Sequence, residues 1–144
     1  MTDDTKPVRD YSLFGDEHVR RYRETDGEVG HIWNGAPIAI LSTTRKDGVT
    51  PRDVPLIYGR DGDDVLVVAS KGGAPDNPLW YADLVRDPDV TVQVLGEVTP
   101  SRARTATAEE KPRLWSIMTA IWPEYDGYQA RTDRDIPLVV LEPR

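Results

Sequence analysis

The stretch VVASKGGAPDNPLWYADL, residues 67–84, runs from an apolar segment through a lysine and two glycines into a helix-like segment. Its first four residues are typical of the end of a buried β-strand. Pro78 follows Lys71 by seven residues and suits the first helical position, with Asp76 or Asn77 as the cap. The stretch therefore predicts a strand, a glycine loop and a short helix that ends near residue 88.

Strands dominate the remainder of the chain. The segments RKDG at 45–48 and GRDG at 59–62 have the composition of tight hairpin turns, which predicts antiparallel pairing of consecutive strands. Such pairing favours a mainly β (α+β) fold, either a small antiparallel barrel with helices outside it or a sandwich. Five short β-rich runs are bounded by glycine, proline and aspartate: PIAILSTT (37–44), DVPLIYG (53–59), DVLVVAS (64–70), VTVQVLG (90–96) and IPLVVLE (136–142).

Two more helices are predicted. The charged segment 15–27 is typical of a surface helix that ends at Gly27. Farther along, Thr107 and Glu110 match a capping box at the start of a longer helix. Apolar residues follow at helical spacing and predict a face that packs on the sheet: Leu114, Ile117, Met118, Ile121 and Trp122.

Length and composition exclude several classes of protein. A chain of 144 residues is the size of one domain, which we expect to span 1–144 with residues 1–10 as a flexible tail. The net charge of −7 opposes nucleic-acid binding, and the absence of cysteine excludes disulfides and thiolate sites. His18 and His31 lie in different segments, so we predict no metal site. We expect a cytoplasmic protein without stable membrane insertion, because we find neither a signal peptide nor a spanning segment.

The loop at Ser70 has two interpretations. Gly72 and Gly73 can simply turn the chain beside a solvated lysine, or they can expose backbone N–H groups to an anion or a planar ring. If this loop and the first hairpin lie at the same end of the barrel, four cations meet at one mouth and suit a phosphorylated or polycarboxylate ligand: Arg45, Lys46, Arg52 and Lys71.

Three aromatic residues, Trp122, Tyr125 and Tyr128, follow the long helix at intervals of three. They can plug one end of the barrel. Alternatively, they can form a wall against which a flat redox-active ring and a flat substrate lie.

Three motifs carry a resemblance to a known family: SKGG at 70–73, NPxWY at 77–81 and YxxYQxxTDRxIP at 125–137. From about residue 28 to the C-terminus the chain resembles the deazaflavin-dependent nitroreductase family, split β-barrel oxidoreductases that use coenzyme F420. The resemblance implies a split β-barrel of about six antiparallel strands with peripheral helices. It implies that the deazaflavin lies in a groove among Arg45, Lys46, Arg52, Pro55, Ser70, Lys71, Gly72, Gly73, Asn77 and Trp80.

The chain departs from the family pattern at three positions. Asp47 replaces a hydroxyl residue in the first hairpin turn, and a carboxylate there weakens phosphate binding unless it turns away or pairs with Arg45 or Arg52. Trp122 stands where relatives often carry tyrosine, and Asp83 stands where asparagine is common. These departures bear on cofactor affinity and on the choice of substrate.

The leading hypothesis is an F420-dependent reductase that transfers hydride to a planar, electron-poor acceptor such as a quinone, a nitroaromatic compound or an activated C=C bond. We expect Tyr125, and secondly Tyr128, to orient the acceptor or protonate the product, and Trp122 to contact the substrate. One alternative is a split-barrel reductase that binds FMN. Another is a non-catalytic protein that binds F420. A homodimer is possible in each case.

Overall fold

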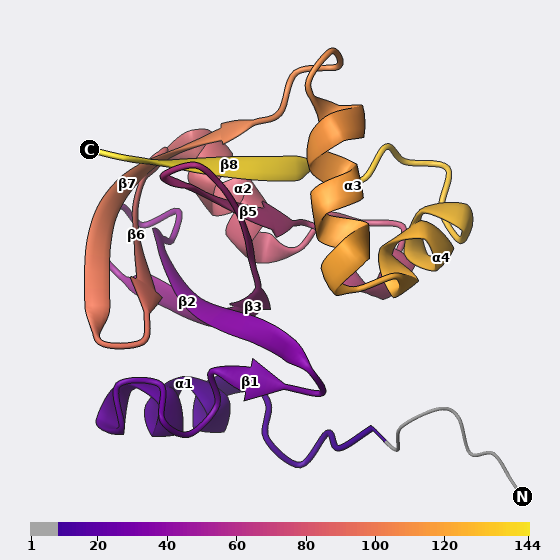
Figure 1. The fold of residues 1–144 in the computed structure, drawn as a ribbon. Coiled ribbons are helices and arrows are strands. Elements are labelled where there is room, and N and C mark those ends of the chain that lie inside the picture. Colours follow the sequence, from indigo (N-terminus) through magenta and orange to yellow (C-terminus); the bar gives the residue numbers. More distant parts are fainter. Residues whose placement is uncertain (1–8) are drawn as a thin grey trace, which may run out of the picture.

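The computed structural model describes residues 9–144, which form eight strands and four α-helices (Figure 1). The strands are β1 Ile32–Trp33, β2 Ala36–Thr44, β3 Pro51–Ile57, β4 Gly59–Asp61, β5 Asp64–Val68, β6 Asp89–Val94, β7 Glu97–Thr105 and β8 Leu138–Pro143. The helices are α1 Gly15–Glu24, α2 Leu79–Arg86, α3 Lys111–Ile121 and α4 Glu124–Ala130, with a short 3-10 turn, η1, at Lys71–Gly73.

The strands form one curled sheet in which every pairing is antiparallel. The order is β1-β2-β6-β7-β8-β5-β4, and β3 pairs with β2. Six of the strands have five residues or more, which confirms the predicted split barrel of about six antiparallel strands. In Figure 1, α1 and β1 lie beside β2, whereas α3 and α4 lie together on the other side of the molecule.

Both predicted turns form hairpins, but consecutive pairing is not general. The first hairpin joins β2 to β3, with Thr44 opposite Pro51, and the second joins β4 to β5. Consecutive strands also pair at β1–β2, β6–β7 and β7–β8. The prediction is wrong between β5 and β6, because β5 pairs with β8 and β6 pairs with β2. The chain therefore crosses the sheet through α2, and this crossover places the loop at Ser70 at one end of the barrel.

Strand β7 and helix α4 were not predicted. In β7, only Ser101 and Ala103 are buried, and the strand also contains Pro100, so its sequence lacks an apolar pattern. Helix α4 has seven residues and contains Gly127, which disfavours helices. Both elements form because their neighbours hold them in place. Strand β7 lies between β6 and β8, and the tyrosines of α4 pack on the apolar cluster that α3 covers.

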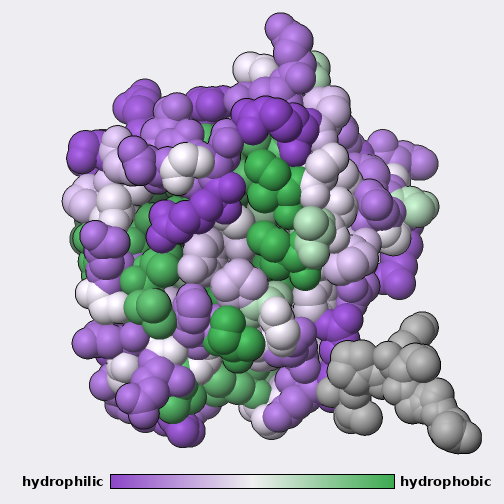
Figure 2. Space-filling model, in the orientation of Figure 1, coloured by the Kyte–Doolittle hydropathy of each residue, from purple (hydrophilic) through white to green (hydrophobic). Residues whose placement is uncertain are grey.

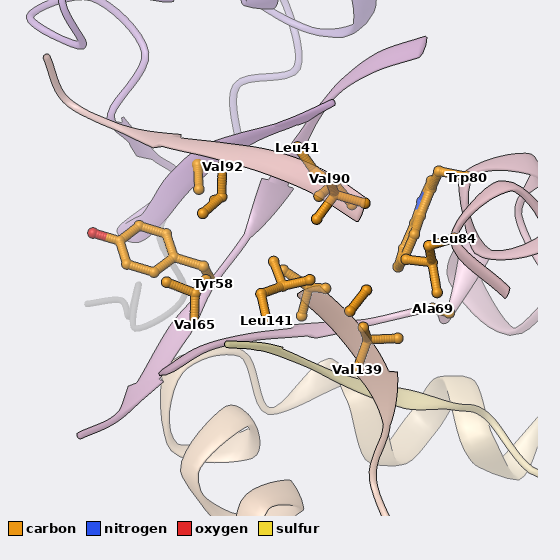
Figure 3. Close-up of a cluster of buried hydrophobic side chains, with 13 residues drawn as sticks. Leu41, Tyr58, Val65, Ala69, Trp80, Leu84, Val90, Val92, Val139 and Leu141 are labelled. Carbon is orange, nitrogen blue, oxygen red and sulfur yellow. The ribbon is translucent and has the colours of Figure 1, made fainter. Parts of the chain in front are cut away.

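The central strands β5 and β8 are apolar on both faces. Val65, Val67, Val139 and Leu141 point into the barrel, where Figure 3 shows Trp80 and Leu84 of α2 at one end of the cluster and Tyr58 at the other. The alternate residues belong to a second core under α3: Leu66, Val68, Leu138 and Val140. Successive side chains of a strand point to opposite faces, so burial of both faces explains why these runs are continuously apolar.

The predicted capping box of the long helix is confirmed. The Thr107 backbone N–H donates to a Glu110 carboxylate oxygen at 2.8 Å, and the Glu110 N–H donates to Thr107 Oγ1 at 3.3 Å. Leu114, Met118 and Trp122 of the apolar face are buried, as predicted. For α2 the predicted cap is wrong, because Pro78 itself occupies the N-cap position with an extended backbone.

Residues 1–8 of the predicted flexible tail lie outside the described residues. The last two residues of that segment make specific contacts. Arg9 pairs with Glu124 of α4, and the Asp10 backbone N–H donates to Asn34 Oδ1 at 2.7 Å. On the surface, Figure 2 shows hydrophilic residues over most of the face, with hydrophobic side chains gathered toward its middle.

Candidate active site

A cavity of about 470 Å³ opens where β3, the end of β5, the η1 turn and the start of α2 meet α4 and the N-terminal segment. The crossover through α2 and the packing of α4 on η1 bring these elements together. Eight residues predicted for the site line this cavity: Pro55, Ser70, Lys71, Gly72, Trp80, Trp122, Tyr125 and Tyr128.

The loop that follows β5 has an unusual backbone conformation. Lys71, Gly72 and Gly73 have φ angles of 47°, 64° and 85°. Three successive residues in the left-handed region turn the chain tightly, and for lysine this conformation is unfavourable. A Cβ added at Gly72 would meet nothing within 4 Å, and Gly72 lines the cavity. The backbone there is therefore bare and faces open space.

Arg134 holds this loop, and the sequence analysis missed its role. Its guanidinium donates to the backbone carbonyls of Ala69 at 3.2 Å, Ser70 at 2.7 Å and Ala74 at 2.8 Å, and to Asn77 Oδ1 at 2.7 Å. A planar fork with several donors suits carbonyls that point to one place. The TDR segment of the third motif was the available signal, but a sequence does not show which carbonyls an arginine meets.

Gln129 fixes the position of Arg134. Its side-chain Nε2 donates to the Arg134 carbonyl at 2.8 Å, and its Oε1 accepts the Ile136 N–H at 2.9 Å. The polar residues of the third motif thus stabilise the turn between α4 and β8. Through Arg134 that turn positions the SKGG loop.

Two predicted cofactor residues, Asn77 and Gly73, do not line the cavity. Asn77 accepts a hydrogen bond from Arg134. Gly73 lies against α4, where an added Cβ would approach the Tyr128 carbonyl oxygen to 2.6 Å. Both residues shape the loop from behind.

The predicted cations do not all meet at one mouth. Lys71 lines the cavity, whereas Arg45, Lys46 and Arg52 lie on the β2–β3 hairpin and are not among its lining residues. The hairpin contacts the far end of α2, where Arg86 donates to the Thr44 carbonyl. Strand β3 runs from this hairpin into the cavity wall, so the hairpin cations lie at the end of β3 that is remote from the cavity.

Arg52 is held by a buried carboxylate. Its Nε donates to Asp83 Oδ2 at 2.7 Å, and Asp83 also accepts from Thr43 Oγ1 at 2.9 Å and Arg86 at 2.9 Å. Asp83 is only 3% exposed, so its charge depends on these partners. The side chain that departs from the family pattern thus ties α2 to the first hairpin.

This arrangement predicts acid sensitivity. Burial alone would raise the pKa of Asp83, but hydrogen bonds from Arg52, Thr43 and Arg86 lower it below its usual value. A lowered pKa in the folded state stabilises the protein above the unfolded pKa of about 3.9, and this contribution is lost as the pH falls through the folded pKa. We expect Asp83→Asn to lower the free energy of unfolding at pH 7 by about 1–3 kcal/mol. Urea unfolding between pH 7 and pH 3 tests this; an undiminished acid-dependent loss in the variant would contradict it.

Asp47 is turned into its own hairpin. Its carboxylate accepts the backbone N–H groups of Val49 at 2.9 Å and Thr50 at 2.8 Å, together with the Thr50 hydroxyl. These hydrogen bonds, led by that of Thr50, lower the pKa of Asp47 to about 2. The carboxylate therefore stabilises the turn, and the first departure from the family pattern has a structural role.

Trp122, Tyr125 and Tyr128 form one wall of the cavity. The rings of Tyr125 and Tyr128 lie edge to face at 6.0 Å, and Trp122 Nε1 donates to the Tyr128 hydroxyl at 3.3 Å. Burial raises the pKa of the Tyr125 phenol well above its usual value. The wall is thus aromatic, and its Tyr125 hydroxyl remains protonated at physiological pH.

A second part of the lining comes from the N-terminal segment and was not predicted. Tyr11, Leu13 and Phe14 line the cavity ahead of α1, together with His18 of α1 and Trp33 of β1. An apolar cluster that precedes a charged helix was the only signal in the sequence. Among the described residues no cluster of metal-ligating side chains occurs, and no helix is long and apolar enough to span a bilayer.

Residues 15–143 match the family model described as F420H(2)-dependent quinone reductase. The chain belongs to this family. Among its relatives is the F420H(2)-dependent quinone reductase Rv1261c of Mycobacterium tuberculosis, which is 42% identical over 135 residues, or 88% of each chain. Membership in the F420H(2)-dependent quinone reductase family confirms the predicted class of enzyme, an F420-dependent oxidoreductase. It supports F420 over FMN as the cofactor.

Solved structures of similar proteins confirm the split-barrel fold. The F420-H2 dependent reductase FDR-A is 36% identical, with a TM-score of 0.70 over 74% of this chain and 94% of that one. A second structure, described as a domain-swapped dimer, is 34% identical, with a TM-score of 0.72 over 88% of this chain and 95% of that one.

Proposed function

We propose that this member of the F420H(2)-dependent quinone reductase family binds reduced F420 at the SKGG loop and delivers hydride to a quinone. The observation that carries the proposal is that the bare backbone at Gly72, the cation of Lys71 and the aromatic wall at Tyr125 all face one cavity. Nitroaromatic compounds and activated C=C bonds are further acceptors of the same electronic type.

The residues present suit a flat cofactor with an anionic tail. The space beside Gly72 accepts a ring or a phosphate close to the backbone, and Lys71 makes no ion pair among the described residues. From the cavity, β3 leads back to the hairpin that carries Arg45 and Lys46, and we expect these two cations to meet the negative charges of a tail. When bound, F420 supplies hydride from its deazaflavin ring, so the chain has to place donor and acceptor rather than perform acid–base chemistry.

Lys71 should contribute to cofactor binding mainly through its charge. We expect Lys71→Ala to weaken F420 binding by about threefold to tenfold at low salt and to reduce the salt dependence of the dissociation constant. Lys71→Arg, the matched control, should retain most of the affinity. Equal affinities of the alanine variant and the unchanged protein at low salt would exclude this role.

The tyrosines should act on the acceptor side. The protonated Tyr125 hydroxyl can donate a hydrogen bond to an acceptor oxygen, and Tyr128 extends the same wall. We expect Tyr125→Phe and Tyr128→Phe together to lower kcat/KM for quinones by about tenfold, because water can replace a tyrosine as proton source. The dissociation constant of F420 should change little. Unchanged turnover with every acceptor would remove this role.

The experiment that tests the function is a fluorescence titration of the purified protein with F420, run beside FMN at two salt concentrations, followed by quinone turnover. Micromolar or tighter binding of F420, weakened by salt and followed by turnover, would support the proposal. Tight binding without reduction of any acceptor would favour a non-catalytic F420-binding protein. Binding of FMN alone would favour the flavin reductase.

A homodimer is part of the proposal. The structure described as a domain-swapped dimer, at 34% identity, supports it. Sedimentation of the purified protein over a range of concentrations measures the state. A cytoplasmic location stays a prediction.

A further inference from the structure

The segment that crosses the cavity between α4 and α1, residues 9–14, is here called the strap. Its first two residues are held in place. Arg9 pairs with Glu124 and its guanidinium lies 4.0 Å from the ring centre of Trp122. The Asn34 side chain accepts the Asp10 N–H and donates to the Asp10 carbonyl.

The strap also packs against the site. The Tyr11 ring lies 5.4 Å from that of Trp33, and Trp33 Nε1 donates to the Leu13 carbonyl at 3.0 Å. The ring centre of Trp33 in turn lies 5.7 Å from that of Trp122, in the wall formed by Trp122, Tyr125 and Tyr128. Tyr11, Leu13 and Phe14 line the cavity. Movement of the strap would therefore change the width of the site.

Two features leave this wall able to adjust to a bound acceptor. Tyr11 is 57% exposed and Phe14 is 69% exposed, although both border the cavity and are large and apolar. The contact at Arg9 is only partly shielded from water, since its side chain is 30% exposed and that of Glu124 is 37% exposed. Such an ion pair with a cation–π contact stabilises one position of a segment without locking it.

We propose that the strap is the acceptor-side wall of the site and that Arg9 determines which quinones are accepted. Arg9 is a positioning residue: it touches Trp122 and Glu124 and holds the aromatic strap over the bound acceptor. With the strap held down, a compact flat quinone is packed on both faces. A quinone with a long aliphatic chain requires the strap to move aside. This inference rests on the proposed function.

The test compares two acceptors with the same ring, methyl-naphthoquinone and methyl-naphthoquinone that carries a decyl chain. We expect Arg9→Ala to shift the ratio of their kcat/KM values by about fivefold to thirtyfold toward the decyl compound. Glu124→Gln should shift it in the same direction by less, because the stack on Trp122 remains. Arg9→Lys keeps the charge and loses the planar stack, so its shift of the ratio should lie between those of Arg9→Ala and Glu124→Gln. In the double variant Arg9→Ala/Glu124→Gln the two shifts of the acceptor ratio should not add, because both substitutions break the same ion pair.

Arg20→Ala is the control, since among residues 9–144 Arg20 pairs only with Glu17 and Glu24 on the exposed face of α1. It should leave the ratio unchanged. F420 affinity should stay within about twofold in every variant, because no hydrogen bond or ion pair in the described chain joins the strap to the SKGG residues. Hydrogen exchange gives a second readout: Arg9→Ala should speed exchange in residues 10–14 and not in α3.

The outcomes separate the two proposals. An unchanged acceptor ratio in Arg9→Ala, with F420 binding intact, would overturn the role of the strap and leave the proposed function standing. A loss of F420 affinity in Arg9→Ala equal to its loss of activity would also overturn it, since the strap would then serve the cofactor. If the unaltered protein neither binds F420 nor reduces a quinone, the proposed function fails and this inference fails with it.

Discussion

Replacement of Arg134 by alanine is expected to lower the free energy of unfolding by about 2–4 kcal/mol and to weaken F420 binding by more than about tenfold. The guanidinium satisfies three backbone carbonyls of the SKGG loop and the Asn77 side chain. Without it, these partly buried acceptors have no donor of comparable geometry. Lys71 holds an unfavourable backbone conformation only because its surroundings impose it.

Arg131 provides the matched control. It lies on the same turn and makes one longer hydrogen bond to the loop, 3.4 Å to the Gly72 carbonyl. Arg131→Ala should cost less than about 1 kcal/mol, in the range of an exposed interaction. Urea unfolding and F420 titration of both variants measure the difference. If Arg134→Ala were as stable as Arg131→Ala and bound F420 equally well, the loop would not depend on this side chain.

Gly73→Ala is expected to lower the free energy of unfolding by about 2–4 kcal/mol, through a steric clash and an unfavourable φ angle together. An added Cβ would lie 2.6 Å from the Tyr128 carbonyl oxygen and 3.0 Å from its Cα, and φ at Gly73 is 85°. Backbone cannot move aside as a flexible side chain can. The substitution should push α4 away from the loop and shift Tyr128, so kcat/KM for quinones should fall as well.

Gly72→Ala separates the clash from the backbone conformation. Gly72 has φ 64°, but an added Cβ would meet no atom within 4 Å, so we expect only the conformational cost of about 1–2 kcal/mol. Gly72→Ala should nevertheless weaken F420 binding, because Gly72 lines the cavity and its new methyl group would enter it. The variant that is less destabilised can therefore show the larger loss of F420 affinity. If Gly72→Ala and Gly73→Ala lowered the free energy of unfolding equally, the clash of the Gly73 Cβ with α4 would add nothing to the cost.

Several features of the fold could be predicted because they depend on local chemistry. The capping box of Thr107 and Glu110 forms as expected, since its partners are three residues apart. The hairpin at 45–48 also forms as expected, because Asp-Gly tolerates the positive φ of a tight turn. Strand β7 was missed because its pairing partners, rather than its own apolar pattern, hold it in the sheet.

In the site, too, residues in short motifs could be predicted and residues that act through long-range contacts could not. Residues in short motifs, such as Lys71 and Tyr125, were found from the sequence and do line the cavity. Arg134 and the strap were not found, because their contacts to the site join residues twenty or more positions apart, as in the hydrogen bonds from Arg134 to Ser70 and from Trp33 to Leu13. Trp122 was expected to pack at the barrel end or to contact substrate, and it also provides the surface on which Arg9 lies.

By itself the sequence determined five of the strand runs, the capping box before α3, the glycine loop and the chemical types gathered at the site, because each follows from residues within a few positions of one another. Tertiary structure alone decided that β8 inserts between β7 and β5, that Asp83 restrains Arg52 and that Arg134 holds the loop. These contacts depend on distances between segments far apart in the chain. Only the folded sheet, with α2 across its end, fixes those distances.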